Sequence, residues 1–318
     1  MDFRFTEAQL ELADTIRDYL RDTHGPEVLR RLDAAGGMRD TQSWQGLVDM
    51  GLTGLLVPEQ FGGLGMGLVE GALIAREAGR VCLSEPLVDT ALTGVPWLTM
   101  RGNLTEQEQD VLAQVVAGDA QIHLFDAINP WAADFASEHI APVASVDPLR
   151  RLTPLDHGDS DPLLVNLAAL MSAAQMIGLA EAMLDQATEY AKVRQQFGQP
   201  IGAFQAIKHQ LASCAVAIEF ARPVVWRAAQ ALEDQLESAL VHVSHAKVAA
   251  TDAAFLTAET AIQVHGAMGY TYEVDLHFWM KRAWALGGAW GDRAFHRKRV
   301  DDAVIGGTHP IGPENSFA

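Results

Sequence analysis

The sequence predicts a mostly α-helical protein with a short β-rich interruption near its middle. Apolar residues recur at helical spacing through the first 120 residues, and again in four long stretches that follow residue 157. Between them, residues 121–157 contain prolines and short β-type runs instead. We therefore predict an N-terminal helical domain at 1–120, a reduced β-region at 121–157 and a C-terminal four-helix bundle within 158–318.

The N-terminal region begins with a helix-start signal. Thr6 and Gln9 have the spacing of a capping box, in which each side chain bonds a free backbone N–H of the first turn. Apolar residues then continue at helical spacing to Leu20. Further helical patterns cover Thr41–Met50, Leu68–Gly79, 87–101 and 105–117, with a glycine-rich loop at 61–67.

The middle region is too short for a large sheet. Gln121–Phe125 and Pro142–Val146 have the composition of strands, and prolines separate them from their surroundings. A stretch of about 35 residues can form at most a few short strands. The C-terminal region is helical again, with predicted helices at Leu163–Val193, Phe204–Glu237, Ala239–Val264 and Leu276–Val300. Short connections between four long helices favour an antiparallel bundle.

Composition excludes several classes of partner. The formal net charge is −18, which disfavours nucleic acid and anionic membranes as partners. Cys82 and Cys214 lack the spacing of metal ligands, and a reduced, cytoplasmic setting is expected. His242 and His245 lie three apart on a helix, but no third ligand is near, so no metal site is predicted. We expect no secretory signal and no apolar segment of membrane-spanning length.

Two segments near the C-terminal end have the residues of an anion site. Arg194–Gln205 contains a fixed cation, aromatic rings, a glycine turn and several amides within twelve residues. Gln263–Tyr270 contains an amide and two glycines at a helix end. Arginine offers a planar fork of donors to phosphate oxygens, and glycines let backbone N–H groups approach an anion. Together the segments can hold a pyrophosphate and an aromatic base.

In this order and about sixty residues apart, the two segments resemble the flavin-binding segments of the acyl-CoA dehydrogenases. The stretch from Trp44 through the glycine-rich loop to Gly65 is similar to the same family, and the resemblance covers roughly residues 1–120 and 160–305. It implies an acyl-CoA dehydrogenase-like fold, FAD as cofactor and an acyl-CoA as substrate. It also implies that residues 121–157 are a remnant of the family's much longer β-domain.

The resemblance also assigns residues to the cofactor. It implies that Arg194 binds the FAD pyrophosphate, that Phe197 packs beside the adenosine part and that Gln205 adds an amide contact. The residues of the second flavin segment are Gln263, Gly266 and Ala267, the last standing where the family usually has glycine. In homodimeric relatives these segments bind the FAD whose ring lies in the neighbouring subunit.

No catalytic base is predicted on this chain. The family removes the α-proton of an acyl-CoA with a glutamate in one of two positions, which correspond here to Gln195 and Trp290. Neither side chain can accept a proton. Asp292 lies two positions further on and would point elsewhere on a helix.

The sequence is therefore similar to the short subunits of paired acyl-CoA dehydrogenases from actinobacterial steroid catabolism. The resemblance implies an α2β2 heterotetramer with a longer catalytic subunit, a bulky acyl-CoA such as a steroid side chain or ring fragment, and an electron-transfer flavoprotein as acceptor. Two alternatives stay open at this point. One is a self-sufficient homodimer with an unrecognised base such as Asp292, and the other is a non-catalytic scaffold.

Overall fold

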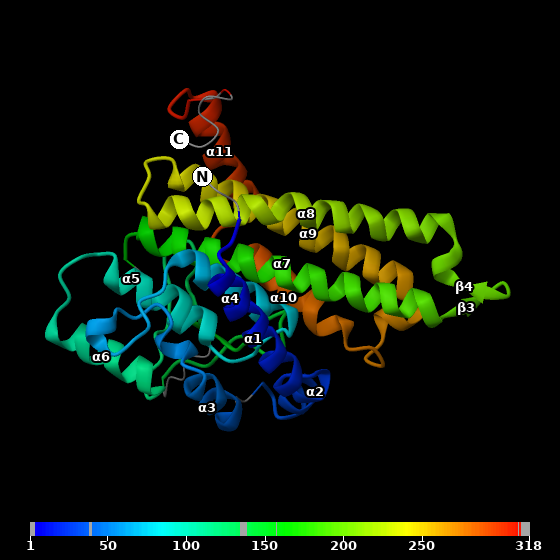
Figure 1. Ribbon diagram of the computed structural model, residues 1–318, viewed down its shortest axis with the longest axis horizontal. Coiled ribbons are helices and arrows are strands. Elements are labelled where there is room, and N and C mark those ends of the chain that lie inside the picture. Colours follow the sequence, from blue (N-terminus) through cyan, green and yellow to red (C-terminus); the bar gives the residue numbers. More distant parts are fainter. Residues whose placement is uncertain (1–3, 38–39, 134–138, 157, 311, 313–318) are drawn as a thin grey trace.

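The structure, a computed structural model, describes residues 4–37, 40–133, 139–156, 158–310 and 312. It confirms the predicted mostly helical fold class, and it places the longest helices in a bundle from which the shorter N-terminal helices extend to one side (Figure 1). The helices before the middle region are α1 (Glu7–Thr23), α2 (Pro26–Ala34), α3 (Thr41–Asp49), α4 (Leu68–Arg80), α5 (Val95–Thr99) and α6 (Glu106–Ala117). The helices after it are α7 (Pro162–Val193), α8 (Gln205–Glu233), α9 (Ala239–His265), α10 (Leu276–Gly288) and α11 (Arg293–Ile305).

Most predicted helices form where the apolar spacing indicates. The Thr6 side chain accepts a hydrogen bond from Gln9 N, and the Gln9 side chain bonds the Thr6 backbone, so the capping box is confirmed. The sequence patterns missed α2, which begins at Pro26, a residue suited to the first helical turn. The single helix expected over 87–101 is instead a π-helical segment, Val88–Gly94, that continues into α5.

The predicted last helix, Leu276–Val300, is wrong as one element. It breaks after Gly288 into α10 and α11, and the bend contains two residues with positive φ, Trp290 at 57° and Gly291 at 92°. Left-handed backbone cannot continue an α-helix, and no proline marked the break. The fourth helix of the bundle is therefore α10, which contacts α7 and α9, while α11 contacts α9 and points away from the bundle axis (Figure 1).

The predicted strands of the middle region are wrong in position. Strands β1 (Trp131–Ala133) and β2 (Leu152–Pro154) form one antiparallel pair, and Val143 adds only an isolated bridge to Leu152. A strand needs a ladder partner, and the 121–125 run has none among the described residues. Two ion pairs attach the region to the helices, the buried pair Arg282–Asp147 and the pair Arg150–Asp89.

Helix α7 forms the centre of the molecule. It contacts α4, α8, α9 and α10, and it is the one helix in the described part of the chain with the length and apolar composition to cross a membrane. This finding corrects the expectation that no segment has that length. However, 89% of the apolar window is buried inside the fold, because other helices cover it.

Two glycines let α4 approach α7 closely. A Cβ on Gly178 would lie 1.9 Å from Arg76 O, and a Cβ on Gly79 would lie 2.1 Å from Gln175 O. The two backbones are therefore in direct contact at this crossing. Because larger residues cannot fit there, the N-terminal helices have a fixed position on the bundle.

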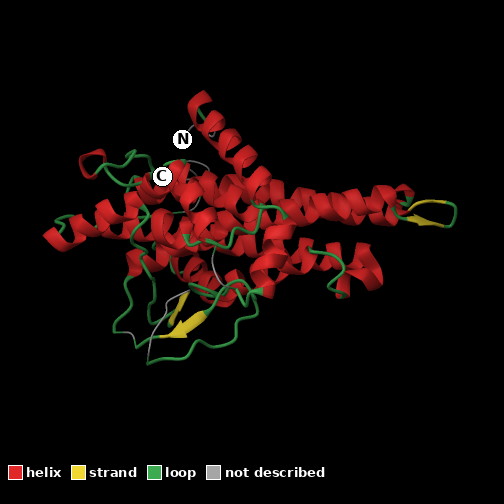
Figure 2. Ribbon diagram, turned by 90° about the horizontal axis from the view of Figure 1, so that it is seen from below, coloured by secondary structure: helices red, strands yellow, loops and turns green. Residues whose placement is uncertain are grey.

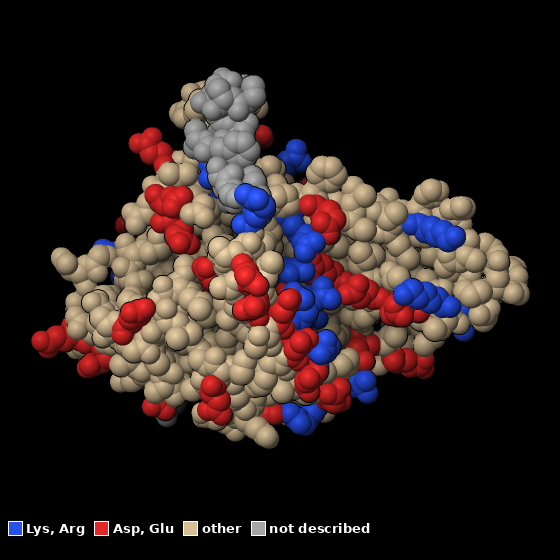
Figure 3. Space-filling view, in the orientation of Figure 1, with Lys and Arg blue, Asp and Glu red and all other residues tan. Residues whose placement is uncertain are grey.

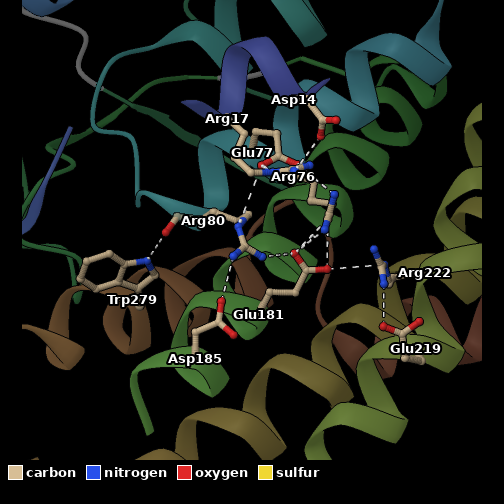
Figure 4. Close-up of polar contacts among 10 residues, drawn as sticks. All are labelled: Asp14, Arg17, Arg76, Glu77, Arg80, Glu181, Asp185, Glu219, Arg222 and Trp279. Atoms are coloured by element: carbon tan, nitrogen blue, oxygen red, sulfur yellow. Dashed lines mark hydrogen bonds and ion pairs between the residues drawn. The ribbon is translucent and has the colours of Figure 1, made fainter. Parts of the chain in front are cut away.

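A network of charged side chains lies beside this crossing (Figure 4). Glu77 of α4 accepts hydrogen bonds from Arg17 of α1 at 3.0 Å and from Arg76 at 2.8 Å. Glu181 of α7 accepts hydrogen bonds from Arg76 at 2.9 Å and from Arg80 at 2.8 Å. The side chain of Glu77 is fully buried. Figure 3 shows acidic and basic side chains mixed in a band across one face of the molecule.

Candidate functional site

The first predicted flavin segment folds into a small hairpin. Arg194 ends α7, and β3 (Gln195–Gln196) then pairs with β4 (Gln199–Pro200). The two residues of the turn, Phe197 and Gly198, have φ values of 51° and 80°. Positive φ at both central positions is typical of a type I′ turn. Glycine adopts it freely, but phenylalanine does so at a cost of about 1–2 kcal/mol.

The hairpin extends beyond the end of the bundle (Figures 1 and 2). The ring of Phe197 is 91% exposed and lies edge-on to the ring of Phe204, with ring centroids 6.1 Å apart. Arg194 is exposed, and its side chain makes no hydrogen bond or ion pair with any residue that the structure describes. An apolar ring on a strained turn, next to a cation without a counter-ion, indicates a surface that contacts another molecule.

Gln205 lies at the first position of α8, exposed and close to the hairpin in sequence. The residue before it, Phe204, provides no side-chain cap for the helix. The first N–H groups of α8 therefore have no partner from that side chain, and they carry the positive end of the helix dipole. Both features favour a negative charge near Gln205.

The second predicted segment lies at the same end of the bundle. Tyr190, one turn before Arg194, stacks on His265 with centroids 4.3 Å apart, and its hydroxyl contacts Met268 Sδ at 3.7 Å. Helix α9 ends at Gly266, whose φ of 63° and ψ of −137° only glycine adopts readily.

The tertiary structure thus brings both predicted segments together around the last turns of α7 and α9. All six predicted cofactor residues are exposed: Arg194, Phe197, Gln205, Gln263, Gly266 and Ala267. The space that a Cβ would occupy at Gly198 and at Gly266 is open to 4 Å. These residues fit the phosphate and adenosine parts of FAD, because they offer a free cation, open backbone turns and an exposed aromatic ring. They form an open surface and not an enclosed pocket.

A separate cavity of about 270 Å³ lies between the middle region and the bend after α10. The indoles of Trp131 and Trp290 are among its walls. The carboxylate among its described lining residues is that of Asp89, which is paired with Arg150. Trp290 thus lines a cavity, and its side chain offers no proton acceptor.

The other candidate positions for a base provide no free carboxylate. Asp292 is the N-cap of α11, and its Oδ1 accepts a hydrogen bond from Phe295 N at 2.8 Å. Gln195 lies exposed on the hairpin. Among the residues described, no group of three or more potential metal ligands is found; the ring of His242 packs edge-on against His309 instead.

Three buried side chains, which the sequence analysis missed, hold the bend that carries Trp290. Lys247 Nζ donates to Leu286 O and to Ala289 O, the latter at 2.9 Å. The Asn129 side chain accepts from Trp290 N at 3.4 Å, and His296 Nε2 bonds Trp290 O at 3.0 Å. Lys247 is the one lysine or arginine of the alanine-rich helix α9, and this lone basic side chain was the signal in the sequence.

Burial changes the protonation of these groups. Lys247 has no exposed surface, and desolvation lowers its pKa to about 7. His296 is also fully buried, and desolvation lowers its pKa to about 4, so this imidazole is neutral near pH 7. A neutral imidazole has one N–H, which it can donate to Trp290 O, while its other nitrogen accepts from the Ser244 hydroxyl at 3.2 Å.

We expect the buried Lys247 to make stability rise with pH. The unfolded chain keeps this amine protonated up to a pKa of about 10.4, so between pH 7 and pH 10 it binds more protons than the folded chain. The free energy of unfolding should therefore gain on the order of 4 kcal/mol across this range from Lys247 alone. Urea unfolding at pH 7 and pH 9 should show this slope in the wild type and its loss in Lys247→Met. Lys298→Met, an exposed lysine on α11, should keep the slope.

Comparison with known proteins agrees with this architecture. Residues 6–119 match the family model for the acyl-CoA dehydrogenase N-terminal domain, and residues 164–305 match that for the C-terminal domain. The chain is 33% identical over 296 residues to acyl-CoA dehydrogenase IpdE2 of Mycobacterium tuberculosis, covering 87% of this chain and 91% of that relative. Its identity to IpdE2 of Mycolicibacterium smegmatis is 30%, covering 86% of this chain and 91% of that relative.

Solved structures show the same fold. A chain of the ChsE4–ChsE5 complex from Mycobacterium tuberculosis superposes with a TM-score of 0.83 at 22% identity, over 96% of this chain and 99% of that chain. A chain of the Tcur3481–Tcur3483 steroid ACAD variant gives a TM-score of 0.82 at 22% identity, with the same coverage. With two family models spanning most of the sequence and a relative of similar length at 33% identity, the chain belongs to the acyl-CoA dehydrogenase family of FAD-dependent oxidoreductases.

Proposed function

We propose that this chain is the subunit of a hetero-oligomeric acyl-CoA dehydrogenase that completes the FAD site of a longer, base-bearing partner. The observation that carries the proposal is the contrast between the two regions of the chain. The exposed end of the bundle has the residues for the phosphate and adenosine parts of FAD. The cavity at the family's base position is small and offers no free carboxylate among its described residues.

The exposed end is suited to a cofactor that is shared between subunits. The hairpin stands clear of its own chain, so Arg194 and Phe197 can reach a ligand whose other side rests on a neighbour (Figure 2). When bound, FAD supplies the hydride acceptor for α,β-dehydrogenation of the acyl-CoA. Arg194 then neutralises phosphate charge, and Phe197 shields the adenosine part from water. Gln205 and Gln263 donate amide hydrogen bonds, and the turn at Gly266–Ala267 brings backbone N–H groups close to an oxygen.

In this proposal, the partner subunit binds the opposite face of the flavin and provides the catalytic base. The middle region contributes one strand pair, β1 with β2, among the residues described. The cavity of about 270 Å³ is below the roughly 300–1,000 Å³ of typical cofactor and ligand pockets. We infer an α2β2 assembly in which the long subunit provides the ring pocket and a glutamate.

The substrate we propose is a bulky acyl-CoA, such as a steroid side chain or ring fragment. The reduced middle region leaves room beside the shared flavin, and one structure of the same fold is a steroid acyl-CoA dehydrogenase. An electron-transfer flavoprotein is the proposed acceptor, and the cytoplasm the proposed location. The proposal for the substrate fails if the purified complex oxidises straight-chain acyl-CoAs faster than steroid-derived ones.

Expression alone and with a long acyl-CoA dehydrogenase subunit tests the central proposal. We expect the chain alone to be colourless. The co-expressed pair should be yellow and tetrameric, and it should retain FAD through gel filtration. Its flavin should absorb at about 450 nm. A yellow, active chain without a partner would support the self-sufficient homodimer and contradict the division of roles between two subunits.

A further inference from the structure

We propose that the cavity between α1, α4 and α8 is a binding site for an amphipathic monocarboxylate, a compact apolar compound that carries one carboxylate group. The cavity shares no described lining residue with the cavity beside Trp290, and none of the six predicted FAD residues is among its walls. The inference therefore does not depend on the proposed function. It rests on the cations of the cavity, on one free donor group and on an apolar wall.

Arginines from all three helices line this cavity. Its volume of about 520 Å³ lies within the roughly 300–1,000 Å³ of typical ligand pockets. The guanidinium groups that reach it belong to Arg17 of α1, Arg76 and Arg80 of α4, and Arg222 of α8. Because like charges repel at such short range, this arrangement needs anions nearby.

The buried carboxylates balance only part of this positive charge. Glu77 is fully buried and the Glu181 side chain is 10% exposed, so two buried negative charges face the four arginines. The remaining carboxylate partners of these arginines are 63%, 64% and 66% exposed, in the order Asp14, Asp185 and Glu219. Exposed ion pairs contribute little, since water and salt screen them. An anion in the cavity can therefore replace an exposed partner at small cost.

Arg222 has a free donor group for such an anion (Figure 4). Its Nε lies 3.4 Å from Glu181 Oε1, and its Nη1 donates to Glu219 Oε1 at 2.6 Å. Its Nη2 donates no hydrogen bond to any residue that the structure describes. A carboxylate that accepts from Nη2 and replaces Glu219 at Nη1 would form a bidentate pair, the strongest geometry between these two groups.

The remaining wall of the cavity is apolar. The rings of Phe5 and Trp226 meet edge-on with centroids 5.7 Å apart, and Leu73 and Pro223 lie beside them. Leu10 of α1 also lines the cavity and is 48% exposed. A ligand that covers these side chains gains from removing apolar surface from water. An inorganic anion has no such gain, so the cavity favours a carboxylate with an apolar body.

Titration of the full chain with phenylbutyrate, a carboxylate with a benzene ring on a short chain, tests the proposal. We expect saturable 1:1 binding by calorimetry that weakens as sodium chloride is added, because salt screens the partly exposed charge pair. Phenylbutyramide has the same skeleton without the charge, and it should bind about tenfold more weakly or worse. Inorganic phosphate, which lacks the apolar body, should show no saturable binding.

Two variants change the charge beside the free donor in opposite directions. Arg222→Gln should weaken the binding of phenylbutyrate about 10- to 150-fold, the effect of losing a hydrogen bond to a charged group. The fold should remain, because Glu181 keeps its hydrogen bonds from Arg76 and Arg80. Glu219→Gln removes the competing carboxylate at an exposed position and should tighten the binding of phenylbutyrate. Arg297→Gln, which removes an exposed arginine of α11, should leave it unchanged.

Four results would each overturn the proposal. They are no saturable binding of phenylbutyrate to the wild type, equal affinities for phenylbutyrate and phenylbutyramide, wild-type affinity in Arg222→Gln, and no tightening in Glu219→Gln. Because Glu219 is exposed, the last variant gives a result even if Arg222→Gln folds poorly. None of these outcomes bears on the FAD surface, which involves other residues.

Discussion

Arg194→Ala is expected to weaken FAD binding by the co-expressed complex about 10- to 150-fold. A hydrogen bond to a charged group contributes about 1.5–3 kcal/mol, which corresponds to that range of affinity. The side chain is exposed and has no partner among the described residues, so its loss should leave the fold intact. Retained FAD can be measured as the ratio of absorbance at about 450 nm to that at 280 nm after gel filtration, with flavin fluorescence giving the Kd.

Matched variants separate the contributions of the charge and of the planar shape of Arg194 to FAD affinity from nonspecific effects of losing an arginine. Arg194→Lys keeps the positive charge but loses the planar fork, and we expect FAD affinity between those of the wild type and Arg194→Ala. Arg297→Ala removes an exposed arginine of α11 that is not part of the predicted segments, and it should leave the FAD content unchanged. An unchanged FAD content in Arg194→Ala would favour the scaffold interpretation of this chain.

Glu77→Ala is expected to lower the free energy of unfolding by about 3–5 kcal/mol. The Glu77 carboxylate is fully buried and accepts hydrogen bonds from Arg17 and Arg76 (Figure 4). Its removal leaves the Arg76 guanidinium, 11% exposed, without one of its two carboxylate partners. An under-compensated cation in the contact between α1, α4 and α7 accounts for the size of the effect. Urea unfolding, followed by circular dichroism at about 222 nm, where α-helices have a minimum, measures this loss of stability.

Asp14→Ala is the control for this variant. Asp14 pairs with the same Arg17, but its side chain is 63% exposed, so its loss should cost less than about 1 kcal/mol. Comparing the stability losses of Glu77→Ala and Asp14→Ala therefore separates the effect of burying the carboxylate from the effect of losing its charge. Equal effects in the two variants would show that the network acts as an ordinary surface ion pair.

The long helices could be predicted from the sequence because their signals are local, and the two flavin segments stay predictions that rest on residue type and short-range spacing. The apolar spacing of Pro162–Val193 and the capping box at Thr6 depend on neighbours within one or two turns. The strands of the middle region could not be predicted in the same way. β1 and β2 are three residues each, and their existence depends on a partner some twenty residues away in the chain. The break after α10 could not be predicted from local sequence either. Lys247, Asn129 and His296, which lie in distant segments, hydrogen-bond the backbone at and just before the left-handed Trp290.

The sequence by itself determined the helical class and the family resemblance, and it predicted the residues suited to FAD phosphates and the lack of a base at Gln195 and Trp290. Each of these follows from residue type and short-range spacing. The tertiary structure alone decided that the hairpin and the turn at Gly266 lie at the same end of the bundle, and that the chain keeps a small cavity behind Trp290. Both depend on how α7, α9 and α10 pack, and packing brings together side chains that no local pattern relates.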